Sequence, residues 1–64
     1  MVIAIITEQK ASELTGFEFQ PGMFYNPVQL SDGRWFISFP EAQYLLASDI
    51  VSIEDYTAQD GNEI

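Results

Sequence analysis

The sequence predicts a small α+β domain, mainly antiparallel β, that forms either a single-core sheet or an SH3-like barrel around a central hairpin. Three observations predict this class: a length of 64 residues, a hydrophobic content of 47%, and two alternating apolar runs around an Asp-Gly pair. A chain this short fits one domain, which we place at residues 1-56. Its core is thin, because a domain of about 60 residues buries only about 60% of its unfolded surface. Residues 57-64 are polar and turn-rich, which predicts a disordered tail.

The first two segments predict a central strand followed by a short helix. Val2–Ile6 is apolar on both alternating faces, as is typical of a strand that is covered on both sides. Thr7 suits a helix N-cap and Gly16 suits a helix end, so we expect one or two helical turns between them. Ala11 and Leu14 are expected to be the inward pair, because a helix this short holds only by docking such residues.

The clearest local signal is a β-hairpin. Phe17-Glu18-Phe19 is expected to be a connection with two aromatic anchors, because Gln20-Pro21-Gly22 ends it with a turn. Met23–Leu30 and Arg34–Phe39 then flank Ser31-Asp32-Gly33. Alternating apolar runs around Asp-Gly predict two paired antiparallel strands.

Two loop types compete for this hairpin, and they aim its side chains differently. A three-residue loop with a glycine bulge places Leu30 opposite Arg34, and a two-residue type I′ turn of Asp32-Gly33 places Leu30 opposite Trp35. A slip of one residue flips every side chain to the other face, so the register with the cleaner apolar face is expected to win. We therefore predict the type I′ turn.

The remaining segments predict a sheet edge and a closing strand. Pro27 lacks an amide proton and so belongs on an edge strand or at a bulge. Residues 41-46 follow a proline and form either a helical turn or an irregular segment, and both alternatives stay open. Ile50–Glu54 reads as a closing strand whose inward residues are Val51 and Ile53.

The composition argues against catalysis. The chain has no Cys and no His, so the commonest nucleophile, the commonest general base and the usual zinc ligands are missing. Glu54-Asp55 is the single adjacent carboxylate pair, and neighbours in a strand point to opposite faces and cannot share one proton. We therefore expect a protein that is not an enzyme, with no catalytic residues, no metal ligands and no cofactor.

The charge balance limits the partners. Lys plus Arg number 2 against 10 Asp plus Glu, a net charge of −8 that repels nucleic-acid phosphates and anionic lipids alike. We therefore expect neither direct nucleic-acid binding nor membrane binding. The apolar run Val2–Ile6 is too short for a secretory signal, so a cytoplasmic protein is expected.

Aromatic residues on the second face of the hairpin are the candidates for binding a partner. In the favoured register this face carries Phe36 and Tyr25, with Phe17 and Phe19 just before the hairpin and Pro27 at its edge. Either the chain itself covers this face, or another chain does. The leading hypothesis is therefore a non-catalytic protein-binding or assembly module that uses these five residues to bind a protein partner or a second copy.

A second hypothesis starts from the charge. An acidic protein can imitate a phosphate backbone and inhibit a DNA-binding protein, provided that its carboxylates are aligned at phosphate-like spacing. Here most acidic residues are scattered singly along the chain, which is more typical of a soluble surface.

The hairpin region also carries a resemblance. The segments Tyr25-Asn26-Pro27-Val28-Gln29 and Asp32-Gly33-Arg34-Trp35-Phe36-Ile37-Ser38 resemble a pattern in short proteins of bacteriophages and prophages of gut bacteria. Leu14 and the segment Ile53-Glu54-Asp55-Tyr56, with Asp55 as an insertion, match flanking parts of that pattern, so that about half of the chain is covered. The resemblance implies a small non-enzymatic phage or prophage protein, structural or accessory, for which the virion is a second possible location.

Overall fold

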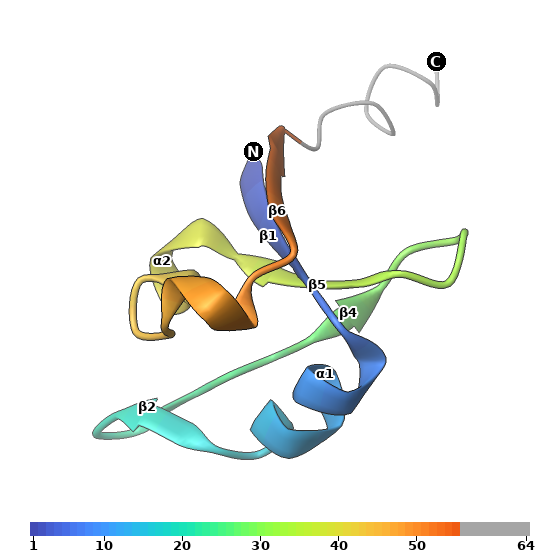
Figure 1. The fold of residues 1–64 in the computed structure, drawn as a ribbon. Coiled ribbons are helices and arrows are strands. Elements are labelled where there is room, and N and C mark those ends of the chain that lie inside the picture. Colours follow the sequence, from blue (N-terminus) through green and yellow to red (C-terminus); the bar gives the residue numbers. More distant parts are fainter. Residues whose placement is uncertain (56–64) are drawn as a thin grey trace.

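A computed structural model describes residues 1–55, and these form an α+β arrangement of mostly antiparallel strands. The strands are β1 (Val2–Ile6), β2 (Glu18–Gln20), β3 (Met23–Phe24), β4 (Val28–Gln29), β5 (Trp35–Ser38) and β6 (Ser52–Asp55). The helices are α1 (Glu8–Leu14), α2 (Phe39–Ala42) and the 3-10 helix η1 (Ala47–Asp49). Figure 1 shows β1 and β6 lying side by side, with α1 and the β2 hairpin at the opposite end of the molecule. The predicted tail, and the last residue of the predicted domain, lie outside the described residues.

The main sheet is open. Its strand order is β4-β5-β1-β6, and β2 and β3 form a separate two-stranded sheet. Within residues 1–55 the two outer strands of the main sheet do not pair with each other. The predicted α+β class is confirmed, and the sheets do not close into a barrel.

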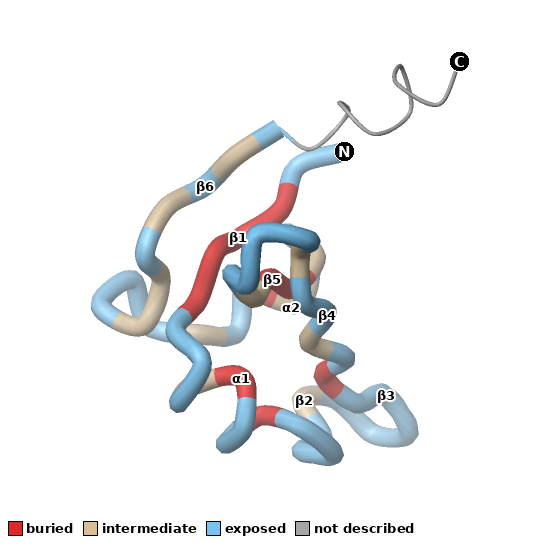
Figure 2. Tube along the Cα trace, turned by 90° about the vertical axis from the view of Figure 1, so that its right-hand side faces the viewer, coloured by how far each residue is buried: buried red, intermediate tan, exposed pale blue. Residues whose placement is uncertain are grey.

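Strand β1 is central and buried on both faces, as its sequence predicts. Residues 3 to 6 are all buried, and Figure 2 shows this stretch as the longest buried run of the trace. On one face, Ala4 and Ile6 join the main core, which the helices and Ile37 complete. On the other face, Ile3 and Ile5 pack with Phe36 in a smaller cluster. The core is therefore divided by the sheet into two layers.

Helix α1 forms where the capping residues predict it. The Thr7 side chain accepts a hydrogen bond from the Lys10 N–H at 3.0 Å, which satisfies one of the free donors of the first turn. The helix ends before Gly16, whose φ of +80° few other residues adopt readily. Ala11 and Leu14 are buried against the sheet, so the predicted inward pair is confirmed.

The predicted type I′ register of the hairpin is wrong. The structure pairs Val28 with Phe36 and Gln29 with Trp35, so that Leu30 and Arg34 close a three-residue loop. A type I′ turn needs two residues with positive φ, and in this loop only Gly33 has one, at +97°. The prediction assumes that only one face of the hairpin is apolar and buried, whereas β5 is buried on both faces.

The predicted strand Met23–Leu30 is divided between two sheets. Its first part, β3, pairs with β2 in a hairpin that turns at Gly22, and its second part, β4, pairs with β5. The segment Phe17-Glu18-Phe19, expected to be a connection, therefore contributes to a strand. Pro27 directly precedes β4, which is an outer strand of the main sheet, as the missing amide proton predicts.

Of the two alternatives after Pro40, the helical turn is found, and it begins earlier than expected. Ser38 caps α2, since its hydroxyl accepts a hydrogen bond from the Glu41 N–H at 3.4 Å. Pro40 lies in the first turn, where an amide proton is not needed. Helix α2 packs against β1 and β5 and buries Ala42.

The closing strand is present, but Val51 and Ile53, which are expected to point inward, do not point into the core. Strand β6 pairs antiparallel with β1, and Val51 lies just before it with its N–H donated to the Ile5 carbonyl at 2.7 Å. The side chains of Val51 and Ile53 are both exposed. Because β6 is an outer strand and the helices pack on β1 and β5, the core ends before it reaches Ile53.

Candidate interaction surface

The five residues predicted to bind a partner are not brought together on one exposed face. Phe36 is 9% exposed and Tyr25 is 6% exposed, so the alternative in which the chain covers these side chains itself is the one observed. Pro27 is half-buried, and Phe17 is exposed away from the larger cavities. Phe19 lines a concave surface.

That concave surface is a groove of about 490 Å³ between the β2–β3 hairpin and α2, which we call the hairpin–α2 groove. The hairpin supplies Phe19, Met23 and Phe24, and the segment around α2 supplies Pro40 and Tyr44. Met23, Phe24 and Tyr44 are each about half exposed, at 51%, 54% and 50%. The complete lining is Phe19, Gln20, Gly22, Met23, Phe24, Ser38, Pro40, Glu41, Gln43 and Tyr44. Apolar side chains that remain half exposed around a hollow are typical of a surface that another molecule covers.

Aromatic contacts hold the two sides of the groove together. The Phe19 ring lies 4.9 Å from the buried Tyr25 ring and 5.2 Å from the Tyr44 ring, centroid to centroid, and both pairs are tilted. The Gln20 side-chain amide also donates a hydrogen bond to the Tyr44 hydroxyl. Tilted aromatic pairs at this separation are attractive beyond the area they bury. The groove is therefore anchored to the main core through Phe19 and Tyr25.

Two carboxylates, one lining the groove and one beside its hairpin turn, are fixed by neutral donors. Glu41 accepts hydrogen bonds from the Asn26 N–H and from the Ser38 hydroxyl, both at 3.0 Å. At the hairpin turn, Glu18 accepts one from the Gly22 N–H at 2.6 Å. Neutral donors orient a carboxylate without cancelling its charge.

The hydroxyl of Tyr25 has a pKa above its ordinary value. Burial of the side chain is the larger cause, and the negative charge of Glu41 is the second.

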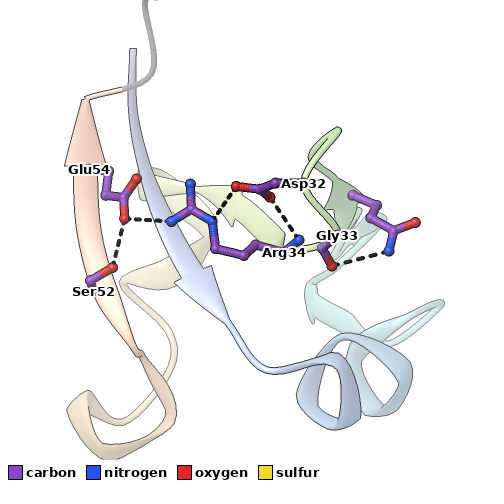
Figure 3. Close-up of polar contacts among 6 residues, drawn as sticks. Asp32, Gly33, Arg34, Ser52 and Glu54 are labelled. Atoms are coloured by element: carbon purple, nitrogen blue, oxygen red, sulfur yellow. Dashed lines mark hydrogen bonds and ion pairs between the residues drawn. The ribbon is translucent and has the colours of Figure 1, made fainter.

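The opposite face of the sheet is crossed by a polar chain centred on Arg34. Figure 3 shows its guanidinium between Asp32 in the hairpin loop and Glu54 on β6, with both nitrogen–oxygen distances at 2.9 Å. Hydrogen bonds to Glu54 and Asp32 hold the pKa of Arg34 above its ordinary value. The hydrogen bond from the Arg34 backbone N–H is the main cause that lowers the pKa of Asp32. The three side chains are paired with one another on the face of the sheet that carries the smaller apolar cluster, which favours a structural role for this face.

Sequence reasoning missed most of the groove. The sequence pattern predicts Met23 and Phe24 in the long hairpin strand, and it leaves Tyr44 in a segment that is either a helical turn or irregular. The signal that could have located them is the Pro21-Gly22 turn, which joins two short apolar segments just as Asp32-Gly33 does. The approach of α2 to that hairpin is a tertiary contact with no local signal.

The described residues contain neither a grouped set of metal-ligating side chains nor a membrane-crossing helix. Within residues 1–55, no three Asp or Glu side chains are grouped so that they could hold a metal ion. No helix in this part of the chain has the length and apolar character to cross a membrane. Comparison with protein-family models, with curated proteins and with solved structures gives no match. The function must therefore be argued from the groove itself.

Proposed function

We propose that this protein is a non-catalytic protein-binding module that holds a partner in the hairpin–α2 groove. The observation that carries the proposal is the set of three half-exposed apolar side chains, Met23, Phe24 and Tyr44, around one hollow. SH3 domains hold peptides in aromatic-lined grooves. The strands here do not close into a barrel, but the groove offers the same kind of lining, with Phe19 as its inner ring.

The size and rigidity of the groove suit a short peptide segment. A volume of about 490 Å³ lies within the range of sites that hold one or two large side chains. The aromatic contacts between Phe19, Tyr25 and Tyr44 hold the walls in place before a partner binds. Binding therefore loses little entropy to the ordering of these side chains. The phage or prophage resemblance of the hairpin adds the proposal that this module is a structural or accessory protein.

The charge-based alternative, imitation of a phosphate backbone, draws less support from the structure. Its requirement is a set of bare carboxylates along one surface. Lys10 contacts Glu13 and Asp49, and Arg34 contacts Asp32 and Glu54, so four carboxylates are held in ion pairs with two cations and are not bare.

Selection from a displayed random-peptide library against the full chain tests the proposal. We expect enriched peptides whose affinity falls at least tenfold in the variant Met23→Ser. The control variant is Val51→Ser, which removes a similarly exposed apolar side chain that does not line the groove and is expected to leave affinity unchanged. Absence of enrichment, or equal binding to both variants, would contradict the proposal.

A further inference from the structure

The charges around the hairpin–α2 groove are negative and lack cationic partners within residues 1–55. Eight of the ten acidic residues lie within residues 1–55. Five of the eight have a cationic partner, which is Lys10, Arg34 or the N-terminal ammonium group. The three without one in this part of the chain are Glu8, Glu18 and Glu41. Glu41 lines the groove, Glu18 accepts a hydrogen bond from Gly22 of its lining, and the lining contains no Lys or Arg.

These two carboxylates are also held in place. The Glu41 carboxylate is fixed by Asn26 and Ser38, and the Glu18 carboxylate by Gly22, a residue of the groove lining. A charge that is already oriented by neutral hydrogen bonds loses little freedom when a cation approaches it. The negative charge is therefore arranged in advance of binding.

Self-association on this surface is disfavoured by the same charges. Each copy carries a net charge of −8, and a symmetric dimer would bring the unpaired Glu18 and Glu41 of two copies to one interface. Like charges that face each other across an interface are strongly unfavourable. The occupant of the groove is better sought in a chain of opposite charge.

We infer that the partner presents a basic segment, in which a large apolar side chain enters the groove and flanking Lys or Arg residues contact Glu18 and Glu41. This inference rests on the proposed function, since it names the partner chemistry of the same groove. The apolar side chain would contact Met23, Phe24 and Tyr44. The net charge of the chain would speed the encounter with such a segment.

Three synthetic peptides test the inference by fluorescence anisotropy with the full chain. The first has a Leu-Trp-Leu centre flanked by lysines, the second has the same centre flanked by glutamates, and the third has a Ser-Gly-Ser centre flanked by lysines. We expect the first peptide to bind at least tenfold more tightly than either of the others. Its affinity should also fall as salt is raised, because exposed charges are screened.

Conservative variants identify which carboxylates contribute. Glu18→Gln and Glu41→Gln keep a hydrogen-bond acceptor, and each is expected to weaken the first peptide about two- to fivefold, the range typical of single exposed charge pairs. Glu8→Gln removes the third unpaired carboxylate, which lies on α1 away from the groove, and is the matched control with unchanged affinity expected. Thermal unfolding of each variant establishes that it is folded.

The outcomes separate this inference from the proposed function. If peptides with lysine and glutamate flanks bind equally and both lose affinity in Met23→Ser, the groove binds peptides but the basic partner is wrong. If the third peptide binds as tightly as the first, or Glu8→Gln weakens binding as much as Glu41→Gln, the attraction is unspecific and the inference is overturned. If Met23→Ser changes the affinity of none of the three peptides, both proposals fail.

Discussion

The guanidinium of Arg34 and the carboxylate of Glu54 meet across the central strand β1, with 2.9 Å between Nη1 and Oε2. The contact joins the residue just before β5 to β6 on the face that carries Ile3 and Ile5, and Asp32 contacts the guanidinium from the other side. The long Arg34 side chain thus covers apolar surface while its charge stays paired. A structural role follows for the Arg34 side chain.

Arg34→Met tests whether the ion pairs of Arg34 or the apolar part of its side chain contributes more to stability. Met keeps most of the apolar length and removes the ion pairs, so we expect thermal unfolding to shift down by only about a few degrees, since exposed ion pairs contribute little. Arg34→Ala removes the cover as well and should lower the midpoint further. Equal midpoints for the two variants would show that the apolar stem contributes nothing.

Gly33→Ala tests the three-residue loop. Gly33 has a φ of +97°, and an added Cβ would meet no atom within 4 Å, so the cost of substitution comes from the backbone alone. We expect Gly33→Ala to lower the free energy of unfolding by about 1–2 kcal/mol, and Gly33→Asn to lower it less, because Asn tolerates positive φ better. Chemical denaturation measures both variants. A fully stable Gly33→Ala variant would contradict the loop geometry.

Substitutions of Trp35 test how its buried indole contributes to stability. Trp35 packs on the main core opposite Gln29, and its indole N–H is buried without a hydrogen-bond partner within the described residues. Trp35→Ala should cost about 2–4 kcal/mol, because a large contact is lost. Trp35→Phe should cost only about 1 kcal/mol, because it also removes an unsatisfied donor. Urea denaturation compares the two, and equal losses would contradict this account of the indole.

Tyr25 predicts a loss of stability at alkaline pH. Burial raises the pKa of its hydroxyl in the folded chain, so its stabilising contribution is complete below the unfolded value of about 10 and is lost as pH rises through the higher folded value. We expect the denaturation midpoint of Tyr25→Phe to fall less steeply than that of the parent above pH of about 10. Parallel curves for the two proteins would show that Tyr25 does not titrate on unfolding.

Local chemistry predicts a good part of this fold. The Thr7 cap, the Gly16 end and the apolar pattern of Val2–Ile6 each act within a few residues, and the structure confirms the elements they predict. The hairpin register could not be obtained in this way. The rule that favours one clean apolar face assumes one buried face, and here Phe36 and Ile37 point to opposite faces and are both buried.

The candidate surface was predicted less well, because it depends on contacts between distant segments. The sequence indicates Phe19 by its aromatic character alone. Its partners Met23, Phe24 and Tyr44 gather around it only because α2 folds back on the β2–β3 hairpin. Likewise, the pairing of Arg34 with Glu54 joins residues far apart in the chain, so the sequence does not show which carboxylates have a cationic partner.

The central claim, that the hairpin–α2 groove is the binding surface, is tested most directly by NMR of the isotope-labelled full chain. Amide signals are followed while the lysine-flanked Leu-Trp-Leu peptide is added. The account predicts that the largest shifts fall on groove residues such as Gly22, Phe24 and Tyr44, with little change at Val51 or Ile53 on the far edge of the sheet. Largest shifts at that far edge, or around Phe36, would contradict it.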